Sequence, residues 1–107
     1  MNIEDIRNKI SEKLSSRDYY GMFEIIDKAS NDYLNLGLSD YNICIELIAQ
    51  NQDLYEYMGA SKQFEMAFDL HKTLVRNRNR LFISCLNDKT ELKSLFKRCV
   101  GDFSTEY

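Results

Sequence analysis

The chain has no proline among its 107 residues and only four glycines. Proline is the residue least compatible with a helix interior, so its absence permits long helices along nearly the whole sequence. Apolar side chains recur at steps of three and four residues, as at Ile3, Ile6, Ile10 and Leu14, and no strand-like alternation runs long enough to compete. The sequence therefore predicts an all-α fold: a single compact domain of about five helices in a small helical bundle or orthogonal array.

Cap and break residues indicate where these helices start and stop. Asn2 is a suitable N-cap for the first helix and Ser39 for the third, and Gly37 suits a left-handed position after the second. Gly59 is expected to break the chain between the third and fourth helices, and a single helix running through it is the alternative. The expected helices span residues 3–14, 17–36, 40–58, 62–86 and 89–100.

The sequence has neither the pattern of a membrane span nor that of a secretion signal. No run approaches the roughly 20 apolar residues that a membrane helix needs, and residues 1–14 contain no apolar stretch. We therefore expect a cytoplasmic domain over residues 1–101, followed by a frayed C-terminal tail at 102–107. Asn, Ile, Lys and Tyr, whose codons are AT-rich, supply 33 of the 107 residues. This composition favours a phage, a mobile element or a low-GC bacterium as the source, and a phage protein would act in the host cytoplasm.

Residues that commonly carry catalysis are sparse. The only histidine, His71, lies on an apolar stripe, where a half-buried core histidine is the simpler interpretation. Cys44, Cys85 and Cys99 fall at apolar positions of three different predicted helices, so we expect buried free thiols rather than a zinc site or a disulfide. No glycine motif for phosphate binding occurs. The sequence thus predicts a protein that is not an enzyme and that has no cofactor and no metal.

Charge is sorted along the chain. Residues 1–59 carry five Lys and Arg against eleven Asp and Glu, whereas residues 60–100 carry nine against four, within a net charge of −3. Basic side chains in the second segment repeat every four residues and so share helix faces. We call them the basic ridge: Lys72, Arg76, Arg80, Lys93 and Lys97. This ridge suits nucleic-acid phosphates or an acidic protein partner, although the acidity of the whole chain argues against nucleic acid.

Tyrosines concentrate in the acidic segment. Tyr41, Tyr55 and Tyr57 share one predicted helix but cannot all face the core, because residues 55 and 57 differ by about 200° around the helix axis. An exposed tyrosine among carboxylates is typical of a protein-binding surface. We call the residues predicted to form this surface the acidic face: Asp18, Tyr20, Glu24, Asp27, Asp53, Glu56 and Tyr57.

Recognition is therefore the predicted function. The first hypothesis is a non-catalytic protein–protein interaction module: a phage- or mobile-element-encoded inhibitor, immunity-type protein or adaptor. Its acidic face would occlude a basic or nucleic-acid-binding protein. The alternative is a nucleic-acid-binding regulator or packaging accessory that uses the basic ridge. A homodimer is compatible with either hypothesis, because Asn51 is a polar residue in the apolar seam of the third helix and because the two segments carry opposite charge.

Overall fold

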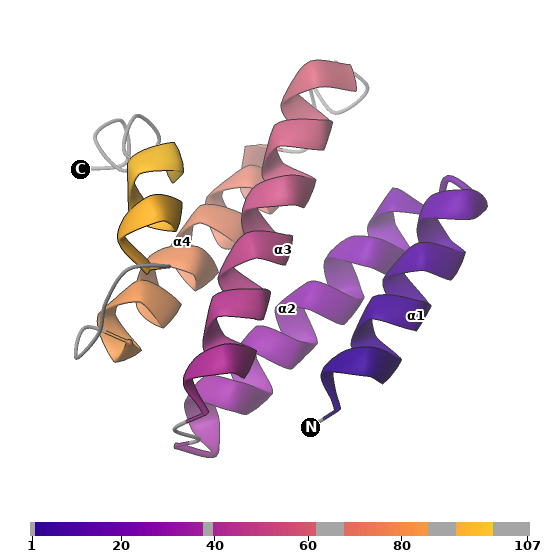
Figure 1. Ribbon diagram of the computed structural model, residues 1–107. Coiled ribbons are helices and arrows are strands. Elements are labelled where there is room, and N and C mark those ends of the chain that lie inside the picture. Colours follow the sequence, from indigo (N-terminus) through magenta and orange to yellow (C-terminus); the bar gives the residue numbers. More distant parts are fainter. Residues whose placement is uncertain (1, 38–39, 62–67, 86–91, 100–107) are drawn as a thin grey trace.

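The computed structural model describes residues 2–37, 40–61, 68–85 and 92–99, which are almost entirely helical (Figure 1). The helices are α1 (Ile3–Ser15), α2 (Tyr19–Asn35), α3 (Tyr41–Ser61) and α4 (Phe68–Ser84). Residues 92–99 form a further helix, and no strand occurs among the described residues. The prediction of a compact all-α domain of about five helices is confirmed. No described helix has the length and apolarity that crossing a membrane requires.

Side-chain hydrogen bonds cap three of the helices. The Asn2 side chain accepts from two backbone N–H groups in the first turn of α1, as predicted. The Asp18 side chain caps α2 by accepting from one backbone N–H, that of Gly21, at 2.9 Å. α2 begins two residues later than predicted because Arg17 has a left-handed φ of 57°. Asp40 caps α3 with bonds of 2.9 and 3.2 Å to two backbone N–H groups. The predicted cap, Ser39, lies outside the described residues.

The connection between α3 and α4 differs from the prediction. Gly37 has the expected left-handed φ, 62°, after α2. Gly59, however, does not end a helix: α3 runs through it to Ser61, since one glycine near a helix end costs only about 1 kcal/mol. α4 is nevertheless a separate helix that packs along α3, so the alternative of one continuous helix is excluded. The predicted start of the fourth helix at residue 62 and the predicted tail at 102–107 lie outside the described residues.

The arrangement of the helices leaves α1 and α3 apart. α2 packs against α1, α3 and α4, whereas α1 packs along α2 and has few contacts with α3 among the described residues. Figure 1 shows α2 running behind the space between α1 and α3. The larger core cluster consists of Ile6, Ala29, Tyr33, Cys44, Leu47, Ile48, Leu81, Phe82, Cys85, Leu92 and Cys99. A smaller one joins α2, α3 and α4 through Met22, Ile26, Leu54, Met58 and Leu74.

Polar side chains are also buried on α3. The Arg78 guanidinium from α4 is 1% exposed, donates to the Gln52 side-chain oxygen and lies 5.8 Å from the centre of the Tyr55 ring. Asn51 is fully buried and donates to the Ser30 hydroxyl at 2.9 Å. Because Asn51 lies inside the domain, it offers no seam to a second copy of the chain. These contacts satisfy part of the hydrogen bonding that burial demands.

The cysteines depart from the prediction. Cys44 on α3 and Cys85 at the end of α4 form a disulfide, whereas Cys99 is a buried free thiol. The expectation of free thiols is therefore wrong for Cys44 and Cys85. The two residues are 41 positions apart, and only the packing of α4 along α3 brings them together. Their sequence spacing carries no sign of that contact.

Candidate protein-binding surface

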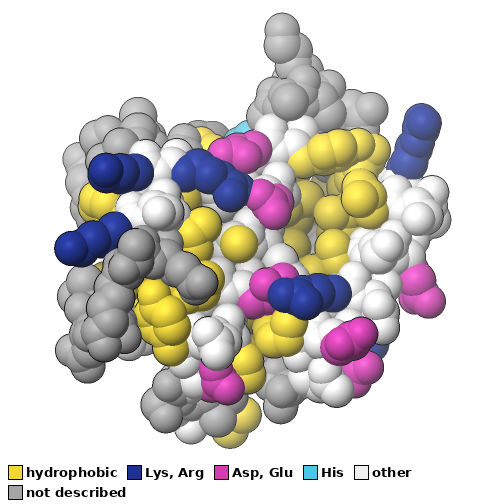
Figure 2. All heavy atoms as spheres, in the orientation of Figure 1, with side chains coloured by type: hydrophobic (Ala, Val, Ile, Leu, Met, Phe, Trp, Pro, Cys, Tyr) yellow, Lys and Arg dark blue, Asp and Glu magenta, His cyan; other side chains and the backbone are white. Residues whose placement is uncertain are grey.

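The space between α1 and α3 is an apolar groove floored by α2. Its volume is about 220 Å³. It is lined by Ile10, Leu14, Met22, Ile26, Gln50, Asp53, Leu54 and Tyr57. Figure 2 shows hydrophobic side chains gathered in this hollow between α3 and α1. Leu14 and Tyr57 are exposed in this lining, whereas Met22, Ile26 and Leu54 are buried beneath it.

Polar contacts bound the groove at both ends. At one end the Arg7 guanidinium of α1 donates to both carboxylate oxygens of Glu46 on α3, at 2.7 Å each. This hydrogen bonding lowers the pKa of Glu46 and raises the pKa of Arg7. At the other end the hydroxyl oxygens of Tyr19 and Tyr57 lie 2.7 Å apart, and this bond raises the pKa of Tyr19. The groove therefore has two defined ends.

Part of the acidic face forms the α3 wall of the groove and is engaged by Arg98. This arginine, from the helix at residues 92–99, pairs with Asp53 and, at 3.3 Å, with Glu56. A hydrogen bond from Gln52, followed by the one from Arg98, lowers the pKa of Glu56. Two carboxylates thus share one guanidinium, and the Asp53 side chain remains 66% exposed. The α3 wall keeps accessible carboxylate oxygens.

Three other residues of the acidic face surround a second hollow, at the start of α2. Asp18, Tyr20 and Glu24 line it together with Lys13 and Lys28. The Asp18 carboxylate lies 3.3 Å from the Lys13 ammonium group, and a backbone N–H of α2 is the main cause of its lowered pKa. Tyr20 is 59% exposed and Glu24 is also exposed. This hollow contains opposite charges in close proximity.

Asp27 lies elsewhere, at the contact between α2 and α4. Its carboxylate accepts from the Asn77 side chain at 2.7 Å and from the Asn31 side chain at 3.2 Å. Arg80 of the basic ridge donates to Asn31 at 3.2 Å. The seven residues of the acidic face therefore occupy three places rather than one. Charges that are sorted along the sequence are neighbours in space.

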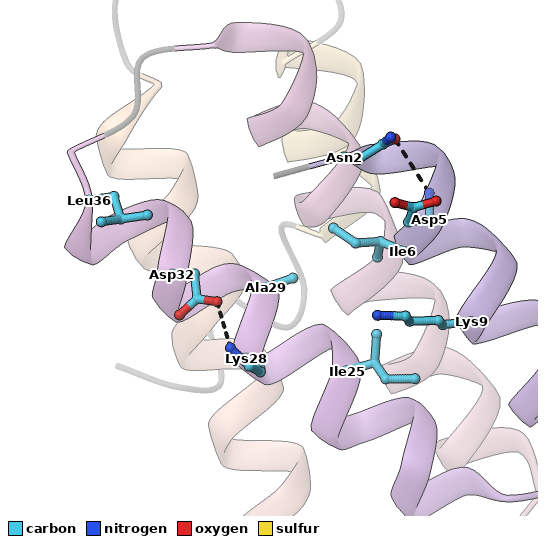
Figure 3. A pocket seen from close by; sticks show the side chains of 9 residues that line it. All are labelled: Asn2, Asp5, Ile6, Lys9, Ile25, Lys28, Ala29, Asp32 and Leu36. Carbon is cyan, nitrogen blue, oxygen red and sulfur yellow. Dashed lines mark hydrogen bonds and ion pairs between the residues drawn. The ribbon is translucent and has the colours of Figure 1, made fainter.

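A third hollow lies between α1 and α2 (Figure 3). Its volume is about 330 Å³. It is lined by Asn2, Asp5, Ile6, Lys9, Ile25, Lys28, Ala29, Asp32 and Leu36. Two carboxylates face two ammonium groups there, and the Lys28 ammonium donates to Asp32 at 2.9 Å. Equal numbers of opposite charges give this hollow no preference for a partner of either sign.

The basic ridge is exposed on two separate helices. Lys72, Arg76 and Arg80 are exposed on α4, and Lys93 and Lys97 are exposed on the helix at residues 92–99. Figure 2 shows basic side chains over the latter helix. The ridge residues are therefore exposed to solvent, and Arg80 also donates to Asn31.

Candidate metal ligands do not gather among the described residues. No set of three His, Cys, Asp or Glu side chains there is arranged to hold a metal ion. His71 is half-buried, as predicted, with its ring centre 5.2 Å from that of Tyr55. Comparison of the chain with protein-family models, curated proteins and solved structures gives no match. The candidate site therefore follows from geometry alone.

The sequence does not predict the groove itself. Leu14 belongs to an apolar stripe that we expected to face the core, whereas Met22 and Leu54, which also line the groove, are buried core residues as expected. Spacing shows that a helix face is apolar, but it does not show whether another helix covers that face. In the structure, Leu14 is 45% exposed because α1 packs on α2 and leaves its flank toward α3 open.

Proposed function

We propose that this chain is a non-catalytic protein-binding module that contacts its partner through the groove between α1 and α3. The observation that carries this proposal is the apolar lining of an open hollow, with exposed Asp53 and Tyr57 on its rim. An apolar centre with a polar rim is the arrangement found in protein interfaces. Both rim residues also belong to the acidic face predicted from the sequence.

On this proposal the partner presents a basic surface, because the charged residue in the groove lining, Asp53 on the α3 wall, is acidic. The protein then acts as an inhibitor, immunity-type protein or adaptor that covers part of a larger protein. A phage or mobile element is the proposed source. The cytoplasm, or the host cytoplasm for a phage protein, is the proposed location.

Two matched leucine substitutions test where the partner binds. Leu14 lines the groove, whereas Leu36 lines the hollow between α1 and α2 and is 71% exposed. The tagged full-length chain is used to capture its partner from a lysate of the source or host cells, with mass spectrometry as the readout. We expect Leu14→Glu to abolish capture, because it places a charge in an apolar contact. Leu36→Glu should leave capture unchanged.

A third variant tests the nucleic-acid alternative in the same experiment. The double substitution Arg76→Ala and Arg80→Ala removes two charges of the basic ridge and should also leave capture unchanged. Loss of capture in this variant, together with loss after nuclease treatment, would favour nucleic-acid binding instead. Full capture by Leu14→Glu would overturn the proposed function. Circular dichroism establishes that each variant is folded.

A further inference from the structure

The walls of the groove determine what kind of chain segment fits it. Both walls and the floor are helices, whose backbone groups are already hydrogen-bonded within the helix. An extended peptide would find no backbone partner there, so it could not bind by adding a strand to the walls. A helix satisfies its own backbone and needs only side-chain contacts. The groove therefore favours a helical segment.

The size of the groove sets how that helix lies. On α3 the lining runs from Gln50 to Tyr57, a separation of seven positions or about 10 Å along the axis. Residues i and i+7 of a partner helix are separated by the same length, about 10 Å. A volume of about 220 Å³ is below the roughly 300–1,000 Å³ of small-molecule sites. The groove thus takes a single row of apolar side chains from a helix that lies on the surface.

The charge on the rim determines which residues should flank the apolar row of the partner helix. α3 contains the carboxylates Glu46, Asp53 and Glu56 and no basic residue. Glu46 is occupied by Arg7, whereas Asp53 and Glu56 share Arg98 between them. Of these carboxylates, Asp53 lines the groove and is the most exposed. A lysine or arginine on the α3-facing flank of the partner therefore meets a carboxylate.

The geometry points to a basic amphipathic helix as the occupant of the groove. Its apolar residues recur at i, i+3 or i+4, and i+7, and its basic residues flank them on the side of Asp53. This assignment rests on the proposed function, and it specifies that the partner segment is helical and basic. It also accounts for the Asp53 carboxylate beside the apolar lining on the α3 wall.

Synthetic helices test this assignment directly. Three 15-residue peptides are titrated into the full chain labelled at its isoleucine methyl groups. One peptide has leucines at i, i+4 and i+7 with flanking lysines, a twin has glutamates in place of the lysines, and a third disperses the leucines around the helix. The basic amphipathic peptide should shift the methyl signals of Ile10 and Ile26 in the groove. Ile83, which is exposed on α4, should not respond.

The charge preference is tested with two matched variants. The natural chain should bind the basic peptide on the order of tenfold more tightly than its acidic twin. Asp53→Lys should remove that preference. Glu24→Lys makes the same charge change in the second hollow, at the start of α2, and should preserve the preference. Equal binding of the two peptides, response at Ile83, or no binding of the basic peptide at about 1 mM would overturn the assignment.

The two proposals fail in different ways. If Leu14→Glu abolishes partner capture but the basic peptide shows no preference, the groove binds protein and the assigned occupant is wrong. If Leu14→Glu captures the partner normally and no peptide shifts the methyl signals of Ile10 or Ile26, both proposals are wrong.

Discussion

The two flanks of α3 are built differently. Toward α4, α3 is joined by the Cys44–Cys85 disulfide and by the buried Arg78 guanidinium on Gln52. Toward α1, the Arg7–Glu46 pair bridges the two helices beside an open groove. The closed flank buries apolar and polar groups and so supplies stability, whereas the open flank leaves apolar surface in contact with water. If the proposed function is right, stability and recognition lie on opposite sides of one helix.

Reduction of the disulfide is expected to produce the largest change, and it acts on the closed flank. Cys44 and Cys85 are 41 residues apart, and in the chain-entropy model a cross-link over such a loop stabilises a protein by about 4 kcal/mol. Adding a reductant should therefore lower the free energy of unfolding by about 4 kcal/mol, measured by urea denaturation.

A Cys85→Ala variant is the matched control for this measurement. It has no disulfide, so its unfolding should not respond to reductant. Equal stability of the natural chain with and without reductant would show that the cysteines are not joined in solution. In a reducing cytoplasm the Cys44 thiol has an acceptor in the Leu81 carbonyl oxygen, 3.2 Å away. Reduction therefore creates a thiol donor that has a backbone acceptor within reach.

Removal of Arg78 should have the next largest effect. Arg78→Ala leaves a cavity at the contact of α3 and α4 and takes the guanidinium from Gln52, at a cost of about 3 kcal/mol. Arg78→Met keeps most of the volume and isolates the polar contribution. Leu14→Ala on the open flank should cost less than about 1 kcal/mol, because Leu14 is already 45% exposed. Equal losses in the free energy of unfolding for Arg78→Ala and Leu14→Ala would show that the two flanks of α3 contribute equally to stability.

The sequence predicts the elements of this fold better than their contacts. The missing prolines and the three-and-four spacing yield the helices, and local chemistry yields the Asn2 cap and the left-handed Gly37. Errors at helix ends also have local causes: Arg17 adopts a left-handed φ, and Gly59 is tolerated in the last turn of α3. Such features depend on a few neighbouring residues and can be read from them.

The candidate site depends on contacts between distant residues. Arg98 reaches Asp53 across 45 positions and Arg7 reaches Glu46 across 39, so the segregation of charge along the chain does not persist on the surface. The groove exists because α1 covers α2 and not α3. Packing between helices determines this arrangement, and the spacing of apolar residues does not reveal it. Tyr57 and Asp53 were predicted as contact residues from composition, whereas Leu14 beside them was expected in the core.

Loss of the ion pair on the open flank should have the smallest effect, and its sign depends on pH. The hydrogen bond from Arg7 is the main cause of the lowered pKa of Glu46. A carboxylate with a lowered folded-state pKa stabilises the fold above its unfolded value, near 4.5, and this contribution is lost as the pH falls through the folded-state pKa. Arg7→Gln should therefore lower Tm at pH 7, on the order of 1–3 °C, and have no effect near pH 2.

Lys9→Gln is the control for this pH dependence, because it removes the same charge from α1 at a residue that lines the third hollow, between α1 and α2. Its effect on Tm at pH 7 should be smaller than that of Arg7→Gln, because Lys9 lacks the two hydrogen bonds that join Arg7 to Glu46. A difference between Arg7→Gln and the natural chain that persists near pH 2 would mean that Arg7 stabilises the fold by packing rather than through Glu46. α2 alone, without the Arg7–Glu46 pair, would then hold α1 and α3 apart. In that case Arg7→Gln should leave peptide binding unchanged, whereas an ion pair that positions α1 against α3 should weaken binding when it is removed.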